Sequence, residues 1–230
     1  AAVGIITGKT VGAGKTELLA QRACYLLQTG ACPAPKRILA ISFKRDAART
    51  LRERVAQRAG EHTERFESYT FDAFAKSLLD RFLVCLPEHL RPRADYKIVP
   101  WSKTDIENFL RTLRPRAQLG STYQLVALDG NAFMRDHVVG RPLPEEPVQP
   151  STLVDWAAGE VWKYSIRNGR LTFPMIGRLA ELILRRSPQI LRALRQTYAF
   201  VLLDEFQDTT GVQYDLTHTA FAGSPAVLTA

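Results

Sequence analysis

Cysteine and long apolar runs are scarce in this sequence, and each scarcity argues against a class of protein. The 230 residues include 3 cysteines. The cysteines lack metal-ligand spacing and cannot all pair, which favours a reducing interior over secretion. No apolar run approaches the roughly 18 residues that a membrane span requires, and no signal-peptide pattern precedes Val3. We therefore expect a soluble, cytoplasmic protein that has no membrane partner.

Acidic residues are fewer than basic ones, and the imbalance favours a polyanionic partner. There are 31 basic and 23 acidic residues, a formal net charge of +8. Residues 36–58 hold eight basic residues against two acidic, and residues 163–195 hold eight against one. Such segments suit a phosphate backbone, whose binding depends on salt. The alternative interpretation is that they are ordinary solvated helix faces.

A glycine-rich turn near the amino end, Gly12-Ala13-Gly14-Lys15-Thr16, follows an apolar run over 3–7 and precedes a helical pattern over 17–27. Strand, glycine turn and helix in this order are typical of a phosphate-binding loop. The glycines let backbone N–H groups close around phosphate oxygens, and the helix directs its amino end at the same anion. We predict that Lys15 reaches the terminal phosphates and that Thr16 ligates Mg²⁺.

The turn departs from the strict phosphate-loop pattern. Position 9 is lysine where the pattern requires glycine, and Gly8-Lys9-Thr10 forms a second triplet of the same kind. The residues after Thr10 include two glycines and suit a helix poorly, whereas a long periodic helix follows Thr16. We therefore choose Lys15 and leave the role of Lys9 open. An ordinary glycine turn is the structural alternative.

Strand and helix patterns alternate in the first third of the chain, which predicts an α/β fold with a parallel sheet. The alternation stops near residues 87–100, most of the next hundred residues are helical, and an apolar strand then resumes. Residues 115–150 give no clear pattern beyond four prolines in 140–150, which predict an exposed loop. The predicted strands cover 37–43, 66–70 and 198–203, and the predicted helices cover 46–57, 71–84, 102–113, 152–167, 174–186, 188–196 and 212–221.

The strand over 198–203 ends in Asp204-Glu205-Phe206-Gln207-Asp208. Ligands of open α/β sheets bind at the carboxyl ends of the strands, so both leading carboxylates are placed for chemistry. Asp204 is expected to hold Mg²⁺ through water, and Glu205 to take a proton from the attacking water. A solvated acidic turn after a core strand is the alternative. Together with the glycine turn, this predicts a nucleotide-binding domain that is split by a helical insertion.

Four motifs give the chain a resemblance to superfamily 1 DNA helicases of the UvrD/Rep/PcrA group. They are GAGKTE at 12–17, ISFKRDAA at 41–48 (motif Ia), YTFDAFA at 69–75 (motif Ib) and LLDEFQDT at 202–209 (motif II). The resemblance implies a RecA-like P-loop domain, 1A, over 1–92 and 197–230. A mostly helical inserted subdomain, 1B, would cover 93–196. It also implies that the second motor domain, 2A/2B, is missing from these residues.

By the same resemblance, the protein uses ATP and Mg²⁺ to move 3′ to 5′ along single-stranded DNA. Two departures stand out: Glu17 occupies a position where a basic residue is common, and Asp72 occupies one where histidine is usual. We leave Asp72 out of the DNA set because a carboxylate repels phosphate.

The resemblance also implies roles for individual residues. Nucleotide binding is implied for Gly12, Ala13, Gly14, Lys15, Thr16, Glu17 and Gln207. Catalysis is implied for Lys15 and Glu205, and metal binding for Thr16 and Asp204. DNA contact is implied for Ser42, Phe43, Lys44, Thr70 and Phe71.

Three other functions stay open from the sequence. A helicase subunit of a RecB- or AddA-like recombination nuclease would share these motifs. Lys9 and Glu17 motivate a non-catalytic DNA-binding scaffold with a decayed loop. A P-loop kinase or transporter ATPase is disfavoured by motifs Ia and Ib. For these residues alone we expect weak nucleotide binding, salt-sensitive DNA binding and little hydrolysis.

Overall fold

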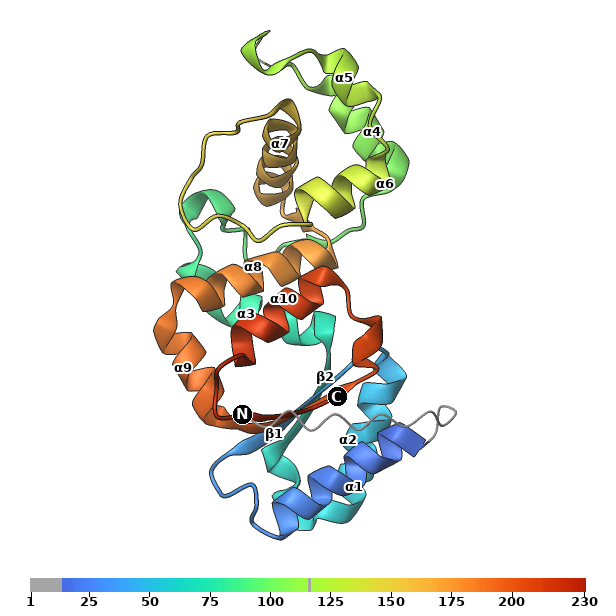
Figure 1. Cartoon of the computed structure of the whole chain (residues 1–230), viewed down its shortest axis with the longest axis vertical. Coiled ribbons are helices and arrows are strands. Elements are labelled where there is room, and N and C mark those ends of the chain that lie inside the picture. Colours follow the sequence, from blue (N-terminus) through green and yellow to red (C-terminus); the bar gives the residue numbers. More distant parts are fainter. Residues whose placement is uncertain (1–13, 116) are drawn as a thin grey trace. The chain divides into compact units, whose positions relative to one another are not determined.

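The computed structural model describes residues 14–115 and 117–230, which form two compact units (Figure 1). The first unit comprises the described residues up to Phe74 together with residues 187–230, and the second comprises residues 75–186. The predicted subdomain boundaries, after residues 92 and 196, fall inside the second and the first unit respectively. The assignment of the units to subdomains 1A and 1B stays a prediction.

The first unit is built on a parallel sheet, as the alternation of strands and helices predicts. Its described strands have the order β2-β1-β5-β6, and every neighbouring pair is parallel. β1 is buried along nearly its whole length, which explains its almost continuous apolar sequence. The last strand, β6, is not among the strands predicted from the sequence. The bounds are β1 Arg37–Ser42, β2 Phe66–Thr70, β5 Tyr198–Asp204 and β6 Val227–Thr229.

Helices cover both faces of this sheet (Figure 1). α1 and α2 lie on one face, and α10 with the start of α3 lies on the other, where the rings of Phe74 and Phe221 stack with centroids 6.5 Å apart. Each predicted helix of this unit is present, with ends within a few residues of the prediction. The bounds are α1 Gly14–Gln28, α2 Arg45–Ala59, α3 Phe71–Phe82, α9 Pro188–Thr197 and α10 Gly211–Phe221, with short 3-10 turns η1 Gly60–Arg65 and η6 Phe206–Asp208.

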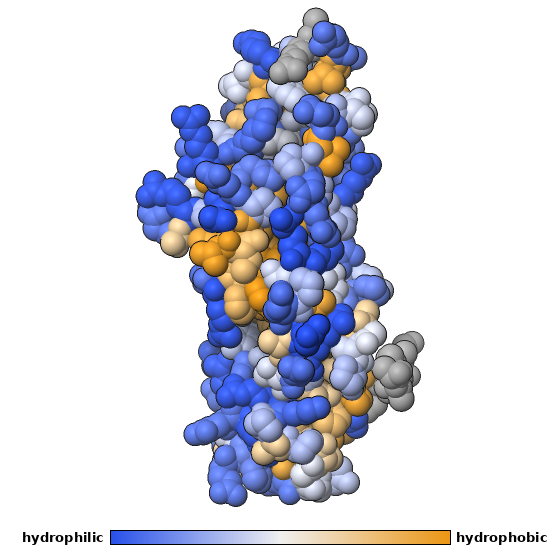
Figure 2. Space-filling view, turned by 90° about the vertical axis from the view of Figure 1, so that its left-hand side faces the viewer, coloured by the Kyte–Doolittle hydropathy of each residue, from blue (hydrophilic) through white to orange (hydrophobic). Residues whose placement is uncertain are grey.

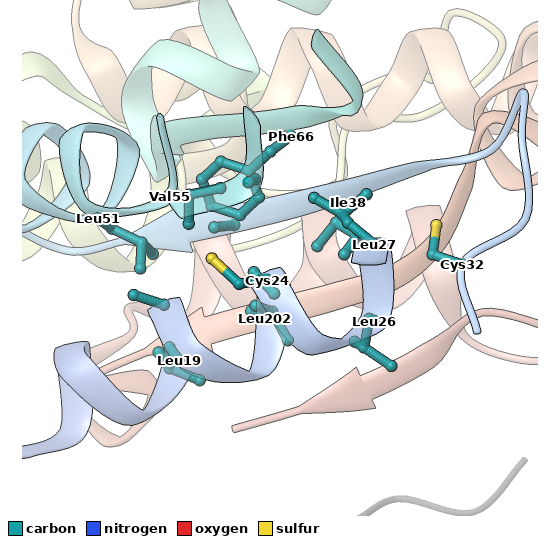
Figure 3. Packing of buried hydrophobic residues seen from close by; sticks show 14 residues of the cluster. Leu19, Cys24, Leu26, Leu27, Cys32, Ile38, Leu51, Val55, Phe66 and Leu202 are labelled. Atoms are coloured by element: carbon teal, nitrogen blue, oxygen red, sulfur yellow. The ribbon is translucent and has the colours of Figure 1, made fainter. Parts of the chain in front are cut away.

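The core of the first unit lies between α1, α2 and the sheet. Leucines spaced by helical turns on α1 belong to one buried cluster with Ile38 of β1 and Leu202 of β5, which are fully buried (Figure 3). Burial of each such side chain contributes roughly 1.5–3 kcal/mol. This packing fixes the direction of α1, and with it the position of the residues in its first turn.

The second unit is mostly helical, as predicted, with one small parallel ribbon of two strands. α7 begins at a cap in which Thr152 Oγ1 accepts the N–H of Asp155, and it ends at Gly169, whose φ of +60° suits glycine. The bounds are η2 Leu83–Cys85, η3 Glu88–Leu90, β3 Lys97–Ile98, α4 Lys103–Thr112, η4 Ala117–Leu119, α5 Thr122–Val126, α6 Gly130–Phe133, the π-helical turn η5 Met134–Val138, α7 Leu153–Asn168, β4 Arg170–Leu171 and α8 Phe173–Arg186.

Figure 2 shows one face, on which hydrophilic residues surround a few small hydrophobic patches. Within residues 14–115 and 117–230, no helix combines the length and the apolar character that a membrane crossing demands. The expectation of a cytoplasmic location stays a prediction.

Candidate nucleotide site and nucleic-acid interface

Lys15 and Glu205 are 190 positions apart in the sequence and meet at the carboxyl edge of the sheet. Lys15 Nζ lies 3.3 Å from Glu205 Oε2, and both side chains keep part of their surface exposed. Lys15 belongs to the first turn of α1, and Glu205 directly follows β5. The fold thus brings together the two sequence regions that were expected to share one site. Their chemical roles remain predictions.

Asp204 is the last residue of β5 and is only 3% exposed. Burial raises the pKa of its carboxyl group, the neighbouring charge of Glu205 raises it further, and Lys15 opposes both. Ser42 is its register partner on β1, and the buried Ser42 hydroxyl has no hydrogen-bond partner among the described residues. A buried carboxylate beside an unpartnered hydroxyl is a site that a cation would stabilise.

The residues present fit a magnesium ion. Mg²⁺ prefers hard oxygen ligands and keeps several waters, so it needs only one or two protein groups. The Asp204 carboxylate and the hydroxyl of Thr16, in the first turn of α1, are groups of this kind. Across the described parts of the chain, no cluster of three or more histidine, cysteine or acidic side chains could hold a metal alone. A metal here would therefore take its remaining oxygen ligands from water or from a bound ligand.

Glu205 has an unusual backbone conformation, with φ of +54° and ψ of +42°. This left-handed region is uncommon for residues other than glycine, and such strain is often found at functional sites. Gln207 Nε2 donates a hydrogen bond to Glu205 Oε2, the same oxygen that Lys15 contacts. The hydrogen bonds from Gln207 and Lys15 lower the pKa of Glu205. The side chain is therefore held as an anion.

The structure places the Glu17 carboxylate against α2. Its oxygens lie 2.9 Å from Arg54 Nη1 and 2.5 Å from Arg58 Nη1. The hydrogen bond from Arg58, followed by one from Gln21, lowers the pKa of Glu17. These ion pairs tie α1 to α2, a role that the sequence did not reveal because the partners are about 40 residues away. Gly14 begins α1, whereas Gly12, Ala13 and the open position Lys9 lie outside the described residues.

The five residues expected to contact DNA gather where β1 and β2 end, at one edge of the sheet. Their exposures differ strongly. The ring of Phe43 is 44% exposed, whereas Phe71 is 2% exposed and Ser42 is fully buried. Thr70 Oγ1 accepts the N–H of Ala73 at the start of α3. Of these two phenylalanines, only Phe43 can therefore offer a ring face to a ligand.

Asp72 faces neighbouring elements within the first unit. Its carboxyl group is hydrogen-bonded to Gln213 of α10 and lies within electrostatic range of Arg45, and burial raises its pKa. An acidic residue is acceptable at this position because its partners are within the protein. This explains how the fold accommodates a carboxylate at this position.

Many of the basic residues in the two charged segments are engaged inside the protein. Five in each segment bond to carboxylates or carbonyl groups. The number of basic residues in each segment therefore overstates how many are available to bind the phosphates of a nucleic acid. The engaged residues are Arg37, Arg49, Arg52, Arg54 and Arg58 in the first segment, and Lys163, Arg178, Arg185, Arg186 and Arg195 in the second.

A parallel α/β domain that carries a lysine and an Asp-Glu pair at the carboxyl edge of its sheet has the architecture of a RecA-like domain. The model of the family described as UvrD/REP helicase N-terminal domain matches residues 10–230. The chain therefore belongs to this family, which confirms the resemblance carried by the four motifs.

The names of curated relatives agree with this family. A probable DNA helicase II homolog of Mycoplasma pneumoniae is 25% identical over 228 residues, with 89% of this chain and 29% of the relative covered. A second, from Mycoplasma genitalium, is 27% identical, with 89% and 30% covered. The ATP-dependent DNA helicase PcrA of Staphylococcus aureus is 26% identical, with 89% and 28% covered. The chain thus spans less than a third of the length of these relatives.

Proposed function

We propose that this chain is the N-terminal 1A–1B portion of an ATP-dependent DNA helicase that moves 3′ to 5′ on single-stranded DNA. The first unit would be subdomain 1A, and the second unit would be subdomain 1B. The family supports this proposal, as do the names of the relatives. The single observation that carries it is the contact of Lys15 with Glu205 beside the buried Asp204.

The proposed nucleotide site joins the amino end of α1 to the carboxyl end of β5. Backbone N–H groups of Gly12, Ala13 and Gly14 would surround the phosphates, with Glu17 holding the following turn against α2. Thr16 and Asp204 would hold Mg²⁺. When bound, ATP–Mg²⁺ supplies the phosphoanhydride bond and the positive charge that offsets the developing negative charge.

Lys15 and Glu205 would exchange partners when nucleotide binds. Lys15 Nζ now contacts Glu205 Oε2, and a terminal phosphate would compete for the same ammonium group. Loss of that contact removes one cause of the lowered pKa of Glu205, so its carboxylate becomes a better acceptor for the proton of an attacking water. Gln207, bonded to the same oxygen, would keep the carboxylate oriented.

The proposed DNA path follows the ends of β1 and β2. The exposed ring of Phe43 can stack on a base, a contact worth roughly 1–3 kcal/mol that every base can make. The next residue, Lys44, would contact the phosphate backbone of the DNA. Ser42, Thr70 and Phe71 are proposed to shape this edge, since Ser42 and Phe71 are buried and Thr70 caps α3.

The remaining two thirds of the relatives' length would supply the second motor domain, 2A/2B. In related phosphoryl-transfer sites an arginine from outside the phosphate loop contributes about 10³- to 10⁵-fold in turnover. We therefore propose that these 230 residues alone bind nucleotide weakly and hydrolyse little of it.

The proposal is tested by ATP hydrolysis of the proposed full-length enzyme with and without single-stranded DNA. The wild type should hydrolyse ATP faster when DNA is added. Lys15→Ala and Glu205→Gln should each abolish turnover, whereas Phe43→Ala should keep the maximal rate and raise the DNA concentration needed for stimulation. Turnover by the Lys15 variant equal to that of the wild type would contradict the proposed nucleotide site.

A further inference from the structure

The second unit contains a pocket of about 280 Å³ that the proposed ATP and DNA sites do not use. It lies between α4, the segment that follows β3, and the end of α7. Small-molecule sites usually hold roughly 300–1,000 Å³, so the volume suits one ring system with its substituent better than a large cofactor. The lining residues that carry the argument are Val99, Trp101, Asp105, Phe109, Tyr164 and Arg170.

Three aromatic rings form the wall of this pocket. The ring centroids of Trp101, Phe109 and Tyr164 lie 5.1 to 5.6 Å apart, at interplanar angles of 58° to 63°. Each ring is only partly buried. Trp101 Nε1 also lies 3.4 Å from the buried Ser165 Oγ, which fixes the indole. The rings are therefore held in place before any ligand arrives, and they keep surface available for stacking.

Charged groups surround the aromatic wall. Arg170 of β4 lines the pocket, and its register partner on β3 is Lys97, so two exposed cations stand side by side. In a strand, alternate residues share a face, which puts Lys97 on the same side as the lining residue Val99. Asp105 also lines the pocket and is fixed by the capping box of α4, where its carboxylate accepts the N–H of Ser102.

We propose that this pocket receives one unpaired base of a single-stranded nucleic acid. The base would stack on the aromatic wall, Asp105 would accept hydrogen bonds from its N–H groups, and Arg170 and Lys97 would face its phosphates. Stacking on aromatic side chains beside a basic track is the usual mode of single-strand binding. This inference rests on the proposed function, because it gives a second contact for the same strand.

Charge decides between this ligand and a peptide. Aromatic-lined grooves can also take proline-rich peptides, which need no cations beside the rings. Here two adjacent cations, Arg170 and Lys97, lie beside a pocket whose lining has a single carboxylate, Asp105, within electrostatic range of Arg170. In a chain of net charge +8, the excess of positive charge complements a phosphodiester strand. A proline-rich ligand is therefore the rival that the experiment must exclude.

The test is the binding of an oligodeoxyadenylate of about 16 nucleotides to the chain. Binding is measured by the quenching of tryptophan fluorescence, at several salt concentrations. Tyr164→Leu should weaken binding about five-fold or more, while leaving the affinity for an abasic strand of equal length unchanged. Arg170→Ala, on an exposed side chain, should weaken binding to both strands. It should also reduce the slope of log affinity against log salt concentration by about one released counterion. Arg167→Ala, at an exposed arginine on α7 outside the pocket, should change neither the affinity nor this slope.

The outcomes separate the two proposals. If the wild type fails to bind any DNA, the proposed function fails and this inference with it. If the wild type binds and both pocket variants bind equally well, only the pocket inference is overturned. A third outcome is that the wild type binds a proline decamer, and that Tyr164→Leu abolishes this binding while DNA binding is unchanged. This outcome would overturn the pocket inference in favour of a peptide ligand. Arg170→Ala keeps the test decisive should Tyr164→Leu fold poorly.

Discussion

Two neighbouring carboxyl groups at the end of β5 have their pKa values moved in opposite directions. Burial raises the pKa of Asp204, whereas hydrogen bonds from Gln207 and Lys15 lower that of Glu205. Groups whose environments separate their pKa values often have different roles in one site. We propose that the buried residue holds the metal and that the more exposed one takes part in proton transfer, and both roles remain predictions.

A second carboxylate, Glu67 on β2, organises the opposite end of the sheet. It accepts hydrogen bonds from Tyr198 Oη at 2.7 Å and from Tyr69 Oη at 3.2 Å, and it pairs with Arg37 at the start of β1. Burial alone would raise the pKa of Glu67, but the bonds from Tyr198 and Arg37 outweigh it and lower the pKa. This cluster ties three strands together through side chains.

We predict that Glu67→Gln destabilises the protein in a way that depends on pH. Because the folded pKa of Glu67 lies below its unfolded value, its contribution is complete above the unfolded pKa and is lost as the pH falls through the folded pKa. The variant should lose about 1–2 kcal/mol of unfolding free energy near pH 7. Its difference from the wild type should shrink towards about pH 3.

Urea unfolding at several pH values measures this difference. Glu64→Gln is the matched control, because Glu64 is an exposed glutamate on the neighbouring turn η1. It should leave stability unchanged at every pH. A gap between Glu67→Gln and the wild type that stays constant with pH would show that the charge of Glu67 is not the cause.

At the scale of elements, the longer helices could be predicted and the short ones could not. α2 and α7 each extend over about four turns, and both ends fall within two residues of the predicted ones. α5 and α6 have 5 and 4 residues, which is too few for an apolar period of 3.6 to show. Their stability comes from caps, such as the Asp129 side chain that accepts the N–H of Ala132.

The proline-containing loop over 140–150 is exposed as predicted, but the end of α8 holds it in place. Arg185 Nη2 donates to the carbonyl of Leu143 at 2.5 Å, and Nη1 of the same side chain lies 3.1 Å from Glu145 Oε1. Arg186 pairs with Glu146 at 3.0 Å. Prolines lack an N–H group, so side chains rather than a backbone ladder must fix such a segment. The sequence could not show this because the partners are about 40 residues away.

We predict that Arg185→Ala releases this loop. The change removes the bonds to Leu143 and Glu145 and the contact with the buried Glu181, and should lower the unfolding free energy by about 1–3 kcal/mol. A loop that opens locally is cleaved faster, so a glutamate-specific protease should cut after Glu145 more rapidly. Arg192→Ala, on an exposed arginine of α9, is the control and should be cut at the wild-type rate. Equal rates for Arg185→Ala and the wild type would contradict the holding role.

At the scale of the whole molecule, the sequence predicted the fold class and the meeting of Lys15 with Glu205, because both depend on patterns that parallel sheets share. It could not predict which charges remain available. Arg54 and Arg58 belong to a basic segment, yet both pair with Glu17 of another helix. It also could not tell that Phe71 is buried while Phe43 is exposed, since both follow strands in similar motifs. Such distinctions depend on tertiary packing.

We propose that α1 and the end of β5 form one site for ATP and Mg²⁺. Calorimetric titration of the 230-residue chain with a non-hydrolysable ATP analogue, in Mg²⁺ and in chelator, tests this proposal. We expect binding that requires Mg²⁺, with an affinity that falls roughly 10- to 100-fold in Lys15→Ala and in Asp204→Asn. Lys36→Ala, at an exposed lysine before β1, should bind the analogue as the wild type does. Binding that is unaffected by chelator, or equal in Lys15→Ala and the wild type, would contradict the proposal.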